Sequence, residues 1–168
     1  MNTNQMRTTL GILIIILGFV SCSKEIEITE SQLTEDQLYL ADHIRPFTGK
    51  CKIVYHNSDK IKEVLTYRNG RPDGEAIYYY INGNIKWKGF YRKGYLSGKW
   101  QFWNEEGKLI YEVHYRNDTL QGEYRSYYPN GNMKEKGSYM NNSRTGEWIA
   151  WSEEGKITTK KEIRINKN

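Results

Sequence analysis

The chain has 168 residues, of which 38% are hydrophobic, 27% are charged and 14% are aromatic. This length fits one domain with an additional segment. The 14 tyrosines and 5 tryptophans argue against disorder of the whole chain, because disordered chains are poor in aromatic residues. Two cysteines cannot form a disulfide-rich scaffold or a four-cysteine zinc site.

The chain begins with a polar segment that carries Arg7, followed by an apolar run over residues 10–20. A membrane-spanning helix needs about 20 apolar residues, so this run is too short to cross a bilayer comfortably. A basic segment followed by such a run is instead typical of a secretory signal peptide. The alternative is a buried core helix, but no amphipathic element follows that could bury it. We therefore predict a signal peptide over residues 1–21.

The apolar run ends at Phe19-Val20-Ser21-Cys22, which resembles a bacterial lipobox. The resemblance implies that Cys22 is lipidated, becomes the first residue of the mature protein and anchors it to a membrane. The next residue is Ser23 rather than aspartate, so the enterobacterial signal for inner-membrane retention is absent, and Lys24-Glu25 is similar to the acidic export signals of surface lipoproteins. The expected location is the bacterial cell envelope, at the outer membrane or surface. The alternative for Cys22 is an ordinary thiol after a simple signal peptide.

The mature chain divides into an acidic and a basic part near Pro46. Residues 22–45 contain two basic and six acidic side chains, a net charge of −4, whereas residues 46–168 contain 22 basic and 14 acidic side chains, a net charge of +8. Within the acidic part, Thr34-Glu35-Asp36-Gln37 matches a capping box and predicts one short helix. We interpret residues 22–45 as a tether between the membrane and a domain over residues 46–168.

From Gly49 onward the sequence repeats itself with a period of about 24 residues. The first glycine of each unit recurs at intervals of 25, 24, 24 and 24 residues, at Gly49, Gly74, Gly98, Gly122 and Gly146. Each unit also has an aliphatic residue shortly after its centre, at Ile61, Ile85, Leu109, Met133 and Ile157, and four units have a tyrosine six residues later, at Tyr67, Tyr91, Tyr115 and Tyr139. A fixed period in this range indicates a repeat architecture.

Each unit has the pattern of two strands joined by a tight turn. Asn82-Gly83 and its counterparts separate an aromatic-rich run from an alternating run, which is a strong hairpin signal. Between units, one column holds residue types that tolerate a left-handed backbone, namely Gly70, Gly94, Asp118 and Asn142. One hairpin is marginal in water, but several can bury a shared face. We predict an all-β fold, an elongated, twisted antiparallel sheet of about five stacked hairpin units.

This succession of motifs resembles the MORN-repeat variant, from Gly49 to about Ile163. Similar bacterial proteins are labelled YwqK-type antitoxins. The resemblance implies a hairpin-repeat fold and, because such repeats are linked to membranes, scaffolding and protein contacts, a binding role. Activity is not implied, since function depends on the sites that a fold carries.

Catalytic motifs are absent from the sequence. Cys51 occupies a column filled elsewhere by alanine or aromatic residues, so we expect a packing residue. Glu105-Glu106 and Glu153-Glu154 lie at turns, where we expect solvated side chains rather than a glycosidase pair. The histidines share no metal-ligand spacing; they are His43, His56 and His114. We predict a protein that is not an enzyme and has no metal or cofactor.

Aromatic side chains are the candidates for partner binding, because tryptophan and tyrosine are frequent interface anchors. The candidates are Trp100, Trp103, Tyr127, Trp148 and Trp151. The spacing of Trp100 and Trp103 places them on opposite faces of a strand unless a bulge intervenes, so at most one of each such pair is expected in the core.

Two functions are compatible with these features. The first is a lipid-anchored envelope protein whose repeat sheet binds a protein or an envelope glycan. The second is an antitoxin or immunity protein that neutralises a toxin by direct binding. Basic strands with interleaved aromatics also suit single-stranded nucleic acid, but export argues against that partner. The positive charge could equally serve only to keep a tyrosine-rich sheet soluble.

Overall fold

The computed structural model describes residues 25–29 and 46–164. The predicted signal peptide, Cys22 and the predicted helix that begins near Thr34 lie outside the described residues. Within these two ranges every regular element is a strand, as predicted for the repeat domain. They include no helix with the length and apolar character to cross a membrane.

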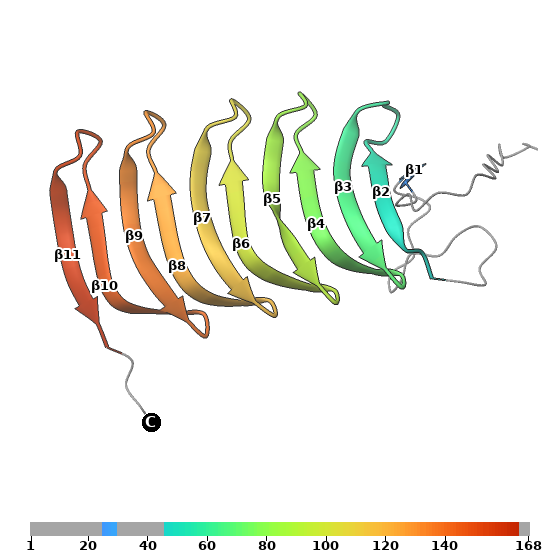
Figure 1. Ribbon diagram of the computed structural model, residues 1–168. Helices are drawn as coiled ribbons and strands as arrows, with labels where there is room; N and C mark the ends of the chain where they lie inside the picture. Colours follow the sequence, from blue (N-terminus) through green and yellow to red (C-terminus); the bar gives the residue numbers. More distant parts are fainter. Residues whose placement is uncertain (1–24, 30–45, 165–168) are drawn as a thin grey trace, which may run out of the picture.

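The strands form a single open sheet in which each strand pairs with its neighbours in sequence (Figure 1). The strands are β1 (Glu25–Thr29), β2 (Gly49–Val54), β3 (Ile61–Arg68), β4 (Arg71–Tyr79), β5 (Ile85–Arg92), β6 (Tyr95–Trp103), β7 (Leu109–Arg116), β8 (Thr119–Tyr127), β9 (Met133–Met140), β10 (Ser143–Trp151) and β11 (Ile157–Ile163). From β2 to β11 all neighbours are antiparallel, which confirms the predicted sheet of consecutive hairpins. The sheet is therefore elongated, and its strands curve along their length (Figure 1).

One strand of the sheet lies in the segment that we interpreted as a tether. The sequence of β1 alternates glutamate and isoleucine, a strand pattern in a segment for which only a short helix was predicted. β1 pairs with β2 in the parallel direction, with Glu25 opposite Lys50 and Thr29 opposite Val54. The sheet therefore includes residues before Pro46 and is not antiparallel throughout.

The turns between repeat units adopt the conformation that the sequence predicts. At each of these turns two consecutive residues have positive φ, for example 49° at Asn117 and 60° at Asp118. This is the backbone of a type I′ turn, which matches the right-handed twist of the strands that it joins. The predicted column has positive φ at all of its positions, Gly70, Gly94, Asp118 and Asn142.

Side chains at both sets of turns tie each repeat unit to the next. The Leu96 N–H donates to Asp118 Oδ1 at 2.7 Å, and the Leu120 N–H makes the equivalent bond to Asn142 Oδ1 at 2.8 Å. At the other end of the strands, the Tyr80 hydroxyl donates to the Trp103 carbonyl oxygen at 2.9 Å. These bonds cross from one unit to the next, so they fix the stacking of hairpins as well as the turns themselves.

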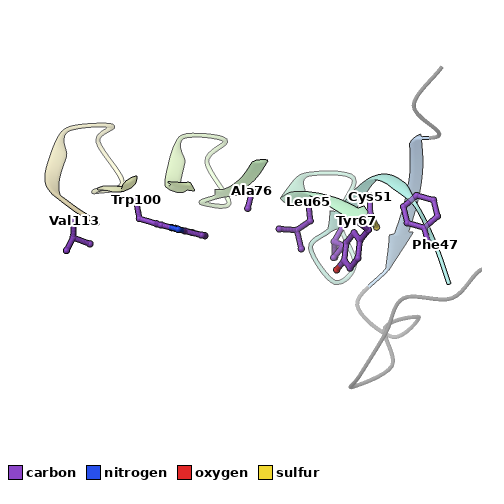
Figure 2. Close-up of a cluster of buried hydrophobic side chains, with 8 residues drawn as sticks. Phe47, Cys51, Leu65, Tyr67, Ala76, Trp100 and Val113 are labelled. Carbon is purple, nitrogen blue, oxygen red and sulfur yellow. The ribbon is translucent and has the colours of Figure 1, made fainter. Parts of the chain in front are cut away.

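One face of the sheet carries the hydrophobic core, which Figure 2 shows with the labelled side chains on the same side of the ribbon. The buried residues come from β2 to β7 and the segment before β2: Phe47, Cys51, Ile53, Leu65, Tyr67, Ala76, Trp100 and Val113. Tyr91, Tyr115 and Tyr139 pack against this cluster, so the predicted tyrosine column belongs to the core face. The predicted aliphatic column is less buried, and its end members Ile61 and Ile157 are exposed.

Candidate functional site

The structure places two of the five candidates for partner binding, Trp100 and Trp148, in the core, which corrects their assignment as binding residues. Trp100 is 1% exposed and Trp148 is 3% exposed. Each ring lies over a glycine of the preceding strand, Gly89 or Gly137, where the missing side chain leaves room for an indole. The two rings are therefore core residues, and a partner cannot reach them in this fold.

The remaining predicted residues, Trp103, Tyr127 and Trp151, are half-buried. Sheet irregularities occur beside each of them, between Phe102 and Trp103, between Ser126 and Tyr127 and between Ala150 and Trp151. As predicted, one tryptophan of each pair is in the core and the other is outside it. The structure does not gather Trp103, Tyr127 and Trp151 with Trp100 and Trp148 into one exposed cluster.

A different set of aromatic side chains forms a continuous row across the core face. Tyr78 of β4 lies opposite Trp87 of β5, Trp87 lies opposite Phe102 of β6, and Phe102 lies opposite Tyr111 of β7. We call these four residues the aromatic row. Because directly opposed residues share a face of the sheet, the row runs perpendicular to the strands.

The rings of the aromatic row contact one another in sequence. Their centroids are 5.3 Å apart for Tyr78 and Trp87, 5.8 Å for Trp87 and Phe102, and 4.3 Å for Phe102 and Tyr111. The last pair is stacked, with 18° between the ring planes, so these two rings present edges rather than their shared faces to a partner.

The aromatic row is only partly covered. Trp87 is 39% exposed, and the other three rings are half-buried. The Tyr78 and Tyr91 hydroxyl oxygens are 3.1 Å apart, so a hydrogen-bonded pair of hydroxyl groups lies at one end of the row. Burial, and then the hydrogen bond with Tyr91, raises the pKa of Tyr78, so this hydroxyl stays protonated. The row is thus a linear apolar surface with phenol groups at its margin.

A carboxylate stands beyond each end of the aromatic row on the same face. Glu63 of β3 lies directly opposite Tyr78. At the other end, Tyr111 lies opposite Ser126 of β8, and Ser126 lies opposite Glu135 of β9. The repeat explains this placement, because Glu63, Trp87, Tyr111 and Glu135 occupy the same position in successive units.

The opposite face of the sheet carries a ladder of charged side chains. Glu112, which is 7% exposed, lies 2.6 Å from Lys99 Nζ and 3.4 Å from the Arg125 guanidinium. Burial by itself would raise the pKa of Glu112, but hydrogen bonds and charges from Lys99, Gln101 and Arg125 outweigh it and lower that pKa below its usual value. Glu75 pairs with Lys88 at 3.0 Å and Glu147 with Lys160 at 2.7 Å on this face. Most of the charged side chains named on this face are therefore paired with an opposite charge from a neighbouring strand.

The groups that could carry chemistry are dispersed. Within residues 46–164 no three histidine, cysteine or acidic side chains lie close enough together to hold a metal ion. Cys51 is fully buried, and burial, followed by the charge of Glu63, raises the pKa of its thiol to about 12. His114 lies with Nδ1 3.1 Å from the carbonyl oxygen of Glu123. Cys51 and His114 are held by packing and a backbone contact, and they do not lie together in one site.

The fold and its surfaces define an open repeat-sheet protein built from tandem β-hairpins. Two consecutive segments, residues 96–117 and 120–141, match the MORN repeat variant family. The matched segments extend from the start of β6 to the end of β9 and include half of the aromatic row. No curated protein is similar enough to the chain to count as a relative.

Sequence reasoning identified the repeat but missed the aromatic row. The signal is present in two columns of the repeat, Ile53, Tyr78, Phe102, Ser126 and Ala150, and Glu63, Trp87, Tyr111, Glu135 and Thr159. Both columns are aromatic only in the middle units. Strand pairing then brings the two columns into a single line, which no comparison of columns one at a time can show.

Proposed function

We propose that this protein is a non-catalytic, lipid-anchored binding protein of the bacterial cell envelope, and that the aromatic row is the surface that contacts its partner. The observation that carries the binding role is the line of four half-exposed rings on one face of an open sheet. Exposed contiguous aromatic surface is costly in water and is a feature of interaction sites.

The composition of the two faces supports this choice of surface. Charged side chains on the opposite face are satisfied by partners in the sheet itself, as Glu112 is by Lys99 and Arg125. On the aromatic row, Lys86 Nζ lies 5.4 Å from the centroid of the Trp87 ring, yet this ring is still 39% exposed. Stacking of Phe102 on Tyr111 leaves ring edges for contact, which suits the side chains of a protein better than the flat face of a sugar ring.

The envelope location rests on the sequence. The apolar run over residues 10–20 and the lipobox-like segment that ends at Cys22 support export and acylation. The intact mass of the protein from fractionated cells tests this part of the proposal, beside a Cys22→Ala variant. We expect a species that begins at Cys22, carries acyl mass and disappears in the variant. An unmodified full-length protein in the soluble fraction would contradict it.

The binding role is tested with two substitutions on the same strand. Trp87 and Phe90 both lie on β5, and their odd spacing places them on opposite faces. They are similarly exposed, at 39% and 50%. We expect Trp87→Ser to abolish cross-linking to a specific envelope protein and Phe90→Ser to leave it intact. Loss in both variants, or in neither, would count against the aromatic row. Capture of a secreted toxin through Trp87 would make the protein an immunity protein.

A further inference from the structure

The repeat position that contributes Trp87 and Tyr111 to the aromatic row holds a glutamate in the units on either side. These residues, Glu63 and Glu135, lie on the same face and in line with the row. A carboxylate on an aromatic surface loses hydration, and this cost is large unless a cation or hydrogen bonds compensate for it. The two glutamates differ in the groups that compensate for the lost hydration of the carboxylate.

Glu135 is neutralised within its own hairpin. Arg144 of β10 donates two hydrogen bonds to it, from Nη1 to Oε1 at 2.9 Å and from Nη2 to Oε2 at 3.2 Å. The same guanidinium lies 3.9 Å above the ring of Trp148. A paired carboxylate and an aromatic ring therefore hold one arginine at this end of the row, in the two-pronged geometry that arginine favours.

Glu63 occupies the equivalent position but has no such cation. Counting back by three repeats of 24 residues, the position of Arg144 is taken by Pro72, which carries no charge. No described residue forms an ion pair or hydrogen bond with the Glu63 carboxylate. Its cross-strand neighbours on this face are Ile53 and Tyr78.

The surroundings of Glu63 are otherwise suited to a cation. Tyr78 lies opposite Glu63, and its ring contacts Trp87, so an aromatic ring is available to a cation at Glu63, as the Trp148 ring is to Arg144. Burial raises the pKa of Glu63, and the charge of the neighbouring Lys62 acts in the opposite direction. A cation brought to this face from outside would meet both a desolvated carboxylate and a ring.

We propose that Glu63 is the specificity residue of the aromatic row and binds an arginine or lysine side chain of a protein partner, whose apolar side chains lie along Tyr78, Trp87 and Phe102. The partner would supply to Glu63 the cation that Arg144 supplies to Glu135. This inference rests on the proposed function, because it names the chemistry of the partner for the same surface.

The test uses two acetylated and amidated pentapeptides with tryptophan at the third and fifth positions. One has arginine at the first position and the other has glutamine. We expect the arginine peptide to bind the mature protein about tenfold more tightly in an NMR titration, since a hydrogen-bonded charge pair contributes about 1.5 kcal/mol or more. Glu63→Gln should remove this preference. The control Glu75→Gln removes a carboxylate from the opposite face, where it pairs with Lys88, and should preserve the preference.

Equal affinity for the two peptides, failure of both to bind, or a preference that survives Glu63→Gln would overturn the inference. Cross-linking to the cellular partner distinguishes failure of this inference from failure of the proposed function. If cross-linking is lost in Trp87→Ser but is unchanged in Glu63→Gln, the aromatic row is the binding surface and the cation site at Glu63 is wrong. If Trp87→Ser also has no effect, the binding surface itself is wrong.

Discussion

Gly89 and Trp100 fit together as a matched pair across neighbouring strands of the sheet. A Cβ atom added to Gly89 would lie 2.2 Å from the Trp100 ring, closer than any side chain can pack. Gly137 and Trp148 repeat this relationship. Two other units fill the same place with different pairs, Val113 with Tyr124 and Leu65 with Ala76. The side chains at the two positions thus compensate for each other in size, because the largest ring lies over the residue without a side chain; we call this the volume rule.

This volume rule predicts that Gly89→Ala destabilises the protein and that a smaller ring restores stability. Overpacking a core costs about 1–3 kcal/mol. We expect Gly89→Ala to lower the free energy of unfolding by that amount in urea titrations. The double variant Gly89→Ala with Trp100→Tyr should recover part of it, because Val113 and Tyr124 show that a branched residue and a tyrosine fit this place. A double variant less stable than either single variant would contradict the rule.

Trp100 and Trp87 differ in burial, so their substitutions should differ in their effect on stability. Trp100→Ala should reduce the free energy of unfolding by about 3–5 kcal/mol, because removal of a fully buried indole leaves a cavity. Trp87→Ala should cost about 1 kcal/mol, since that ring is 39% exposed. Chemical denaturation of both variants measures the difference, and similar losses would show that the aromatic row is structural rather than a binding surface.

Glu112 should stabilise the protein at neutral pH and lose this effect in acid. Its pKa in the folded protein lies below the usual value, so its stabilising contribution is present above the unfolded pKa of about 4.3 and is lost as the pH falls through the folded pKa. We expect Glu112→Gln to cost about 1–3 kcal/mol at pH 7 and to approach the wild type at low pH. Melting temperatures across this pH range measure the effect, with Glu75→Gln as an exposed ion-pair control near 0–1 kcal/mol.

Glu63 should show the opposite pH dependence. Burial raises its pKa in the folded protein, so its stabilising contribution is fully present below the unfolded pKa of about 4.3 and is lost as the pH rises through the folded pKa. We therefore expect Glu63→Gln to be at least as stable as the wild type at pH 7. The stability of the wild type relative to this variant should increase as the pH is lowered. A variant that is clearly less stable at pH 7 would reveal a structural role for the carboxylate.

Cys51 should be chemically inert in the folded protein. Its side chain is fully buried and burial, with Glu63, raises the pKa of the thiol to about 12, so almost no thiolate is present near neutral pH. In a Cys22→Ala variant, where Cys51 is the sole cysteine of the chain, we expect no reaction with a thiol reagent at pH 8 until denaturant is added. Rapid reaction without denaturant would show that the start of the sheet opens readily.

Local features of the repeat were predictable because they depend on backbone conformation. Positive φ at Asp118 and Asn142 follows from residue types that tolerate it, and the hairpin order follows from turns that recur every 24 residues. The face that a side chain occupies was harder to predict. Trp100 and Trp103 have the same chemistry, and the glycine across from Trp100 on the preceding strand, Gly89, decides that this ring is the buried one.

By itself the sequence determined the all-β hairpin repeat, the positions of its turns and the absence of recognisable catalytic motifs, because these depend on residue types at a regular spacing. The tertiary structure decided which aromatic residues are core, and it brought two separate repeat columns into the single line of Tyr78, Trp87, Phe102 and Tyr111. It also distinguished Glu63 from Glu135. The physical reason is that burial and charge pairing depend on neighbours across strands, and strand register sets those neighbours.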